Sequence, residues 1–179
     1  MPRYIALLRA VNVGGRIVKM EALRAHFESL GFANVETYIA SGNVIFETKA
    51  GTEDVLRRKI ETHLEAALGH EVATFLRTTA EMGSISRFQA FDEAALKSAQ
   101  ALNVAFLHAP LDDDAREILM ALRTDIDDFS VHGREVYWLC RKKQSESKFS
   151  NALFERKLKI QATFRGINTV RKLAQLYPA

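Results

Sequence analysis

The chain has 179 residues, of which 47% are hydrophobic and 26% are charged. This balance is typical of a soluble globular protein, and the length suffices for one large domain or two small ones. No apolar run approaches the length of a membrane-spanning helix, and the N-terminus lacks the long apolar segment of a signal peptide. Cys140 is the only cysteine, which excludes an internal disulfide. We therefore expect a cytoplasmic protein.

The formal net charge of +3 is unevenly distributed along the chain. From Arg134 to the end there are 11 Lys/Arg and 3 Asp/Glu, a charge of +8, whereas the preceding residues carry 14 and 19, a charge of −5. A basic C-terminal quarter suits phosphates or an acidic partner. The alternative is a basic face that is simply solvated.

The first part of the chain predicts the element order β-α-β-β-α-β. The apolar run RYIALLRAV predicts a buried strand that ends at Gly14-Gly15. VETYIA and NVIFET predict two strands joined in a hairpin at Ser41-Gly42-Asn43, and EVATFLRT predicts a fourth strand. Apolar residues recur at helical spacing in two segments between these strands: Met20, Leu23, Phe27 and Leu30, then Leu56, Ile60, Leu64 and Leu68.

The second part begins after a polar, mostly helical connector at residues 79–99 and predicts the order β-α-β-β-α-α. LNVAFLHA predicts a strand, and LDDDAREILMAL predicts a helix with acids in its first turn, where they suit the helix dipole. FSVHGREVYWLCR predicts a hairpin about Gly133, and SESKFSNALFERKL and INTVRKLAQLY predict two helices.

These two orders indicate an α+β fold. We expect two packed ferredoxin-like (split β-α-β) units, with mostly antiparallel sheets and helices on one face. The expected domains are an N-terminal unit at residues 1–78, the helical connector at 79–99, and a C-terminal unit with a basic tail region at 100–179.

The stretch RAVNVGGRIVKM is the first candidate site. A strand delivers Arg9 to its end, Asn12, Gly14 and Gly15 form a turn, and Lys19 precedes a helix. Bare backbone N–H groups and a helix N-terminus attract anions, so the stretch suits a phosphate or a carboxylate. It matches neither a P-loop nor a G-x-G-x-x-G fingerprint, and a plain strand-helix connection also explains its glycines.

Two further stretches are candidates. Ser41, Gly42 and Asn43 offer donors and acceptors on a tight turn, although a plain hairpin turn requires no more. In TFRGINTVRKL, Arg165 precedes a helix whose N-cap we expect at Asn168 or Thr169. Arg171 and Lys172 follow in the first turns of that helix, where cations oppose the dipole unless an anion lies nearby.

The sequence shows no residue pattern typical of a metal site or of nucleophilic catalysis. The five histidines show no zinc-ligand spacing, and we expect His26 and His63, on predicted helices, to have structural partners. Cys140 fits a buried small hydrophobe. The run Asp112-Asp113-Asp114 is better explained by helix capping than by a cation. We assign no metal, no cofactor and no catalytic residue, and whether the protein is an enzyme stays open.

Trp138, Phe149 and Phe154 lie among basic residues. This arrangement raises a second function class, single-stranded RNA binding by base stacking on the sheet of a ferredoxin-like unit. The aromatic motifs of the usual RNA-binding form are absent from the sequence, and the spacing of these aromatics also fits a hydrophobic core.

The stretches YIALLRAVNVGG and KMEALRAHFESLGFANVETYIASGNVIF resemble the uncharacterised bacterial family named domain of unknown function 1697, and ATFRGINTVRKL resembles its closing motif. The resemblance runs nearly end to end and implies ferredoxin-like plaits, but no activity. The positions characteristic of the family map onto Arg9, Asn12, Gly14, Gly15, Lys19, Met20, Ser41, Gly42, Asn43, Thr163, Arg165, Asn168 and Thr169. Ala10, Gly166 and Ile167 depart from the family's usual Gly, Asn and Trp.

From the sequence we predict that the protein binds a small anionic or phosphorylated ligand at strand and hairpin ends. The predicted ligand-binding residues are Arg9, Asn12, Gly14, Gly15, Lys19, Ser41, Gly42, Asn43, Arg165, Asn168 and Thr169. The alternatives are a nucleic-acid-binding protein and a scaffold or oligomerisation protein without a ligand. No membrane partner is expected, and the sequence leaves the oligomeric state undefined.

Overall fold

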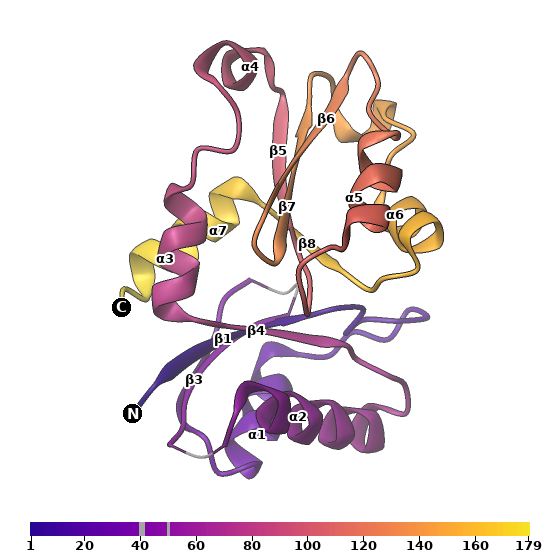
Figure 1. The fold of residues 1–179 in the computed structure, drawn as a ribbon. Coiled ribbons are helices and arrows are strands. Elements are labelled where there is room, and N and C mark those ends of the chain that lie inside the picture. The colour runs from indigo at the N-terminus through magenta and orange to yellow at the C-terminus, as the bar shows by residue number, and fades with distance from the viewer. Residues whose placement is uncertain (40–41, 50) are drawn as a thin grey trace. The chain divides into compact units, whose positions relative to one another are not determined.

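The computed structural model describes residues 1–39, 42–49 and 51–179. The chain forms two compact units, Met1–Gly83 with Leu173–Ala179, and Ser84–Lys172. Each unit contains one four-stranded antiparallel sheet, and helices accompany both sheets (Figure 1). The mixed α+β class with two sheets, predicted from the sequence, is therefore confirmed.

The first unit follows the predicted order of strands and helices. Its elements are β1 (Arg3–Leu8), α1 (Met20–Ser29), β2 (Ala33–Thr37), β3 (Asn43–Glu47), α2 (Glu53–Leu68) and β4 (Thr74–Thr78). The strands lie in the order β2-β3-β1-β4, and every neighbouring pair is antiparallel. The two sequential hairpin strands, β2 and β3, are thus neighbours, whereas the central strand β1 joins two partners that come later in the chain.

Both helices α1 and α2 cover one face of this sheet (Figure 1). The apolar residues that recur at helical spacing face the sheet, because positions three and four apart lie on one side of a helix. They pack against alternate residues of the strands, which share one face of the sheet. The central members of this core are Leu23, Phe27, Leu56, Ile60, Leu64, Ala6, Leu8, Val44 and Phe46, all buried.

The second unit repeats this plan with additions. Its elements are the part of α3 (Thr79–Arg87) from Ser84 onward, α4 (Glu93–Ser98), β5 (Ala101–Phe106), α5 (Asp113–Met120), β6 (Asp127–His132), β7 (Glu135–Cys140), the 3-10 turn η1 (Gln144–Glu146), α6 (Asn151–Leu158), β8 (Thr163–Gly166) and the part of α7 (Ile167–Leu176) up to Lys172. The strand order β6-β7-β5-β8 is the same as in the first unit. Helices α5 and α6 cover one face of its sheet (Figure 1).

Strand β8 was not predicted from the sequence. Its four residues, Thr163–Gly166, pair antiparallel with β5 from Phe106 to Asn103. The strand has only four residues and passes directly into α7, so the sequence has too short a pattern to separate it from the helix that follows. The second unit is therefore β-α-β-β-α-β followed by a helix. That helix begins at Ile167, one residue before the earlier of the two predicted N-caps, Asn168 and Thr169.

The aromatic residues of the second unit form its core. Trp138 and Phe149 lie with ring centroids 4.8 Å apart in an edge-on contact, and Phe154 lies edge-on against Phe164 at 6.0 Å. Trp138, Phe149 and Phe154 are all buried. Their apolar surface is therefore used in packing the sheet against α5 and α6, and it is not available as an exposed stacking platform.

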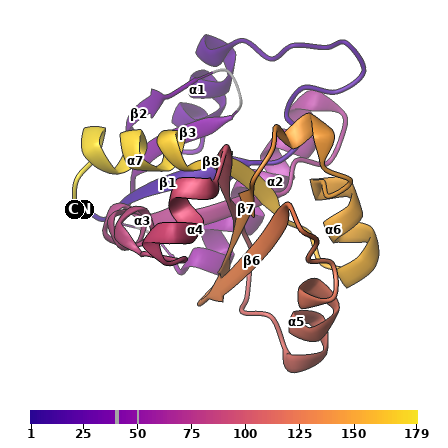
Figure 2. The ribbon, with the colours of Figure 1, turned by 90° about the horizontal axis from the view of Figure 1, so that it is seen from above.

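The two chain ends meet within the first unit, as the view from above shows (Figure 2). The Arg3 guanidinium donates to the carbonyl oxygen of Pro178 at 2.7 Å. It also lies 5.7 Å from the ring centroid of Tyr177, a cation–π distance. The C-terminal segment Leu173–Ala179 thereby groups with the first unit, although it follows the second in the chain.

Candidate functional site

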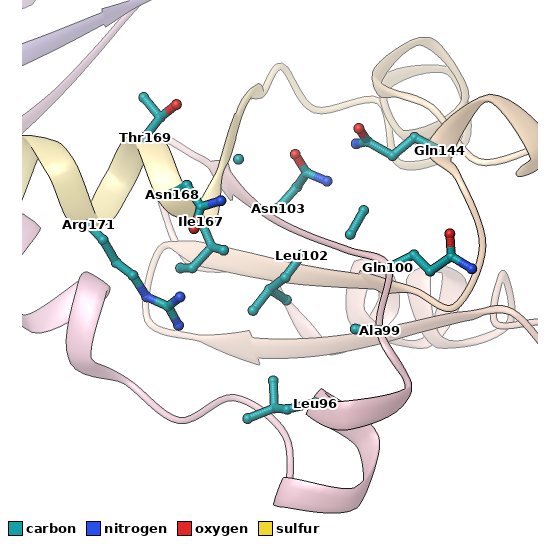
Figure 3. Close-up of a pocket in the computed structure, with 12 residues that line it drawn as sticks. Leu96, Ala99, Gln100, Leu102, Asn103, Gln144, Ile167, Asn168, Thr169 and Arg171 are labelled. Carbon is teal, nitrogen blue, oxygen red and sulfur yellow. The ribbon is translucent and has the colours of Figure 1, made fainter.

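The candidate site is a hollow of about 530 Å³ in the second unit, shown in Figure 3. Its walls come from α4, the start of β5, η1 and the junction between β8 and α7. This volume is in the range of small-molecule sites. The lining residues are Leu96, Ala99, Gln100, Ala101, Leu102, Asn103, Gln144, Gly166, Ile167, Asn168, Thr169 and Arg171.

Asn103 supplies the most informative side chain in this hollow. The residue is only 8% exposed, yet its side-chain amide makes no hydrogen bond within the described part of the chain. Because the amide borders the hollow, water or a bound molecule can supply the hydrogen bonds that the protein does not. An amide that lines a hollow and lacks a protein partner is therefore a candidate to bind a ligand.

The N-terminal turn of α7 adds backbone donors to the same hollow. The first N–H groups of a helix have no intrahelical partner, and Asn168 and Thr169 of this turn line the hollow. Together with the helix dipole, such groups attract anions. Arg171, one turn further along α7, brings a positive charge to the same wall (Figure 3).

The hollow is open because β8 ends in a glycine. Gly166 lies opposite Asn103 in the sheet, and a Cβ atom at Gly166 would be 3.8 Å from Asn103 Oδ1. A larger side chain there would extend over the amide. Gly166 and Ile167, two of the three positions where the chain departs from the motifs it resembles, both line this hollow.

Sequence reasoning named Asn168 and Thr169 and discussed Arg171, but it missed Asn103. Arg165 is not part of the lining. Its guanidinium donates to Thr163 Oγ1 at 2.8 Å and to the carbonyl oxygen of Phe164 at 2.9 Å. Burial lowers the pKa of Arg165 to about 10. The signal for Asn103 is an amide within the apolar strand LNVAFLHA, where a buried polar residue requires a partner.

The glycine stretch of the first unit forms an exposed loop closed on itself. Asn12 Oδ1 accepts a hydrogen bond from the Val18 N–H at 2.8 Å, and the Arg16 N–H donates to the Val13 carbonyl at 3.0 Å around Gly14-Gly15. Both glycines have positive φ, +62° and +78°, which explains their presence in this turn. The Asn12 oxygen thus closes the loop.

The other predicted residues of the first unit lie beside this loop or in the hairpin. Arg9 is half-buried at the end of β1, and Lys19 is exposed at the N-cap of α1, with no side-chain capping hydrogen bond. Asn43 is fully buried, and its amide donates to the Tyr38 carbonyl at 2.8 Å across the hairpin. Ser41 lies outside the described residues.

Two of the three predicted stretches come together. The Leu8 N–H donates to the Gly42 carbonyl at 2.9 Å, and a Cβ atom at Gly42 would be 3.0 Å from Leu8 Cβ and 3.4 Å from Val11 Cγ1. The short distance to Leu8 and the φ of +89° together explain why residue 42 is a glycine. The third stretch, with Arg165, lies in the other unit, so a surface shared by all three stays a prediction.

Other reactive side chains are engaged structurally. His26 Nδ1 lies 3.1 Å from His63 Nε2 between α1 and α2. Burial, and then the charge of His63, lower the pKa of His26. Cys140 is buried, and that burial raises the pKa of its thiol, which disfavours a nucleophilic thiolate. Asp112 caps α5 by accepting from the Ala115 N–H at 2.7 Å.

Across residues 1–39, 42–49 and 51–179, no group of three or more His, Cys, Asp or Glu side chains is placed to hold a metal ion. Within the same ranges, none of the helices combines the length and the apolar character needed to cross a bilayer.

Comparison with known proteins places the chain in a family. A family model described as protein of unknown function, DUF1697, matches residues 1–137, and the chain belongs to this family. Its fold is similar to the structure of the conserved bacterial protein SP0830 from Streptococcus pneumoniae, with a TM-score of 0.78 and 24% identity over 100% of this chain and 99% of that one. At this identity the likeness concerns the fold alone. No curated protein matches the chain.

Proposed function

We propose that the protein binds a small anionic ligand in the hollow at the start of α7. The observation that carries this proposal is the Asn103 amide, which lines the hollow without a hydrogen-bond partner in the described part of the chain, beside the N-terminal turn of α7. The amide offers donors and an acceptor, the helix turn offers donors, and Arg171 offers charge. A phosphate or a carboxylate satisfies the donors and the charge.

The arrangement supports binding more directly than catalysis. Neither a nucleophile paired with a base nor a pair of carboxylates lines the hollow. Gln100, Gln144 and Asn103 instead supply neutral amides, and Leu96, Leu102 and Ile167 supply apolar surface. This mixture of apolar walls and a few polar groups suits the recognition of a small molecule with one anionic end.

The nucleic-acid alternative has less support. The three aromatic side chains considered for base stacking are buried in the core of the second unit. The remaining support for nucleic-acid binding is the charge of +8 from Arg134 to the end of the chain. Such binding would weaken steeply with salt, whereas a small ligand held by several hydrogen bonds would depend less on salt.

The test is a titration of the ¹⁵N-labelled protein with inorganic phosphate and with a mononucleotide. We expect the amide signals of Ile167, Asn168 and Thr169 to shift in a saturable way. Arg171→Ala should weaken binding by about tenfold, the effect of losing one charge-assisted contact. Lys172→Ala is the matched control, because Lys172 is the adjacent exposed cation on α7 and does not line the hollow.

If neither anion shifts these three signals, or if Lys172→Ala weakens binding as much as Arg171→Ala, the proposed site is wrong. If Arg171→Ala and Lys172→Ala weaken mononucleotide binding equally, and this binding falls steeply with salt, the result would favour the nucleic-acid alternative. Thermal stability of both variants, measured in parallel, verifies that each remains folded.

A further inference from the structure

A second hollow, of about 460 Å³, lies elsewhere in the second unit. One wall is the loop from the end of α5 to the start of β6, residues 121–127, and the other is the segment that leads from the end of η1 into α6. The volume is in the range of small-molecule sites. The second hollow shares no lining residue with the hollow at the start of α7, so it is a separate candidate site.

Much of the lining of this second hollow is apolar. Phe149 is 4% exposed, and Leu122 and Leu153 are half-buried side chains that pack against the core of the second unit. Ile126, which is also half-buried, adds to the same lining. Apolar surface of this kind gains free energy when an apolar group replaces the water beside it. The second hollow therefore suits a ligand with an apolar body.

One buried carboxylate ties the two walls together. Asp127 accepts from Thr124 Oγ1 in one wall at 2.9 Å, and from Ser147 Oγ beside the other wall at 2.8 Å. The Ser147 hydroxyl in turn accepts from the Phe149 N–H at 3.0 Å. The second hollow is thus preorganised, because its two walls and its aromatic residue are all fixed through one side chain.

The same carboxylate lacks a cationic partner. Asp127 is 2% exposed, and its other partners are the Trp138 indole N–H at 2.9 Å and the Cys140 thiol. All of its partners are neutral, and no Lys, Arg or His among the described residues forms an ion pair with it. Buried charges in proteins are usually compensated by an opposite charge. The hydrogen bonds of Asp127 are therefore made, whereas its charge is uncompensated at the wall of a hollow.

The rest of the lining also favours a positive charge. Three carboxylates and two cations line the second hollow: Asp125, Asp127, Glu146, Arg123 and Lys148. Arg123 is anchored away from the carboxylates, since its Nε donates to the Met120 carbonyl of α5 at 3.1 Å. Helix α5 ends at the second hollow with its C-cap Ala121, and the C-terminal end of a helix attracts cations.

We propose that the second hollow binds a small organic ammonium ion, a primary amine on an apolar carbon skeleton. The skeleton packs against Phe149, Leu122 and Leu153. The ammonium group donates to the exposed carboxylates of Asp125 and Glu146 and supplies the positive charge that Asp127 lacks. This inference does not use the proposed anion site or any residue of it.

The experiment compares three probes with similar aromatic bodies on the ¹⁵N-labelled full chain at about pH 7, where the amine is charged. The probes are 2-phenylethylamine, the neutral 2-phenylethanol and the anionic 3-phenylpropanoate. We expect the amine to shift the amide signals of Leu122 and Phe149 in a saturable way. The alcohol should bind about tenfold more weakly because the charge interaction is lost, and the anion more weakly still. Asn168, at the other hollow, is the reference amide.

Two variants test the part played by the buried charge. Asp127→Asn keeps the shape and one acceptor oxygen but removes the charge, so it should weaken amine binding by about tenfold and leave alcohol binding unchanged. Asp128→Asn is the matched control, because Asp128 is the next residue of β6, points to the opposite face of the sheet and does not line the second hollow. If Asp127→Asn fails to fold in a urea titration, Asp125→Asn takes its place, since Asp125 is exposed and lines the same hollow.

Three results would overturn the proposal. The first is an amine that shifts neither Leu122 nor Phe149. The second is an alcohol or an anion that binds as tightly as the amine, because the lining would then show no preference for positive charge. The third is an equal loss of amine and alcohol binding in Asp127→Asn, which would make the role of Asp127 purely structural.

Discussion

Asn103 and Gly166 lie opposite each other across β5 and β8, and a Cβ atom at the glycine would be 3.8 Å from the Asn103 oxygen. The glycine therefore keeps the amide uncovered. Because the φ of Gly166 is not in the left-handed region, a side chain is compatible with its backbone. The glycine at this position is therefore explained by access to the Asn103 amide and not by a backbone conformation that requires glycine.

Gly166→Leu is expected to abolish anion binding without loss of stability. The leucine side chain would extend over Asn103 and fill the hollow, and replacing a strand glycine stabilises by about 0.5–1 kcal/mol. Phosphate titration and urea unfolding measure the two effects. Gly166→Ala is the control, since its single methyl group is in ordinary contact and should leave most of the binding.

Asn103→Leu should eliminate binding without loss of stability. The substitution has nearly the same shape, and it removes an amide that lines the hollow and has no hydrogen bond to the described part of the protein. We expect an unchanged or higher midpoint of thermal unfolding together with loss of the phosphate-induced shifts. A lower midpoint would mean that the amide is satisfied in the folded protein and that its role is structural.

Asp127→Ala should destabilise the second unit by about 3 kcal/mol, because it leaves buried donors unpaired. Asp127 is buried and accepts from Trp138 Nε1 at 2.9 Å, from Ser147 Oγ at 2.8 Å and from Thr124 Oγ1 at 2.9 Å. Asp125→Ala, an exposed neighbour, should change the free energy of unfolding by less than about 0.5 kcal/mol. Equal effects in urea unfolding would contradict the network.

The His26–His63 contact predicts a loss of stability as the pH falls from about 7 to about 5. Burial, and then the charge of His63, lower the pKa of His26 below its ordinary 6.5, so the unfolded chain binds more protons than the folded one. Stability is complete above the unfolded pKa and declines as the pH falls through the folded value. His26→Gln should flatten this dependence in urea unfolding; an unchanged slope would assign it to other groups.

Gly42→Ala should destabilise the first unit more than Gly69→Ala. Both glycines have positive φ, +89° and +80°, so both substitutions cost about 1–2 kcal/mol of backbone free energy. Only at Gly42 does the added Cβ come within 3.0 Å of Leu8 Cβ, and Leu8 is buried. The difference between the two variants in urea unfolding measures this contact, and equal losses would exclude it.

The elements of the first unit were predictable because their signals are local. Leu56, Ile60 and Leu64 repeat at helical spacing, and the helix they define is capped by Thr52 and ends at Gly69, as residue types alone indicate. Two antiparallel sheets follow from strands of this length separated by helices and a tight hairpin. Asn12 lies in a loop, as predicted, whereas Asn43, predicted in the hairpin turn, is the first residue of β3. Their hydrogen bonds with Val18 and Tyr38 depend on how the loop and the hairpin close.

The strand β8 and the candidate site required the tertiary structure. Four residues from Thr163 to Gly166 have too little pattern to identify a strand, and their pairing partner β5 lies about 60 residues earlier in the chain. By itself the sequence determined the α+β class, most helices, and the presence of polar residues near the last helix. Only the register of β5 with β8 placed Asn103 opposite Gly166, where no side chain covers the amide, because strand pairing is a non-local property.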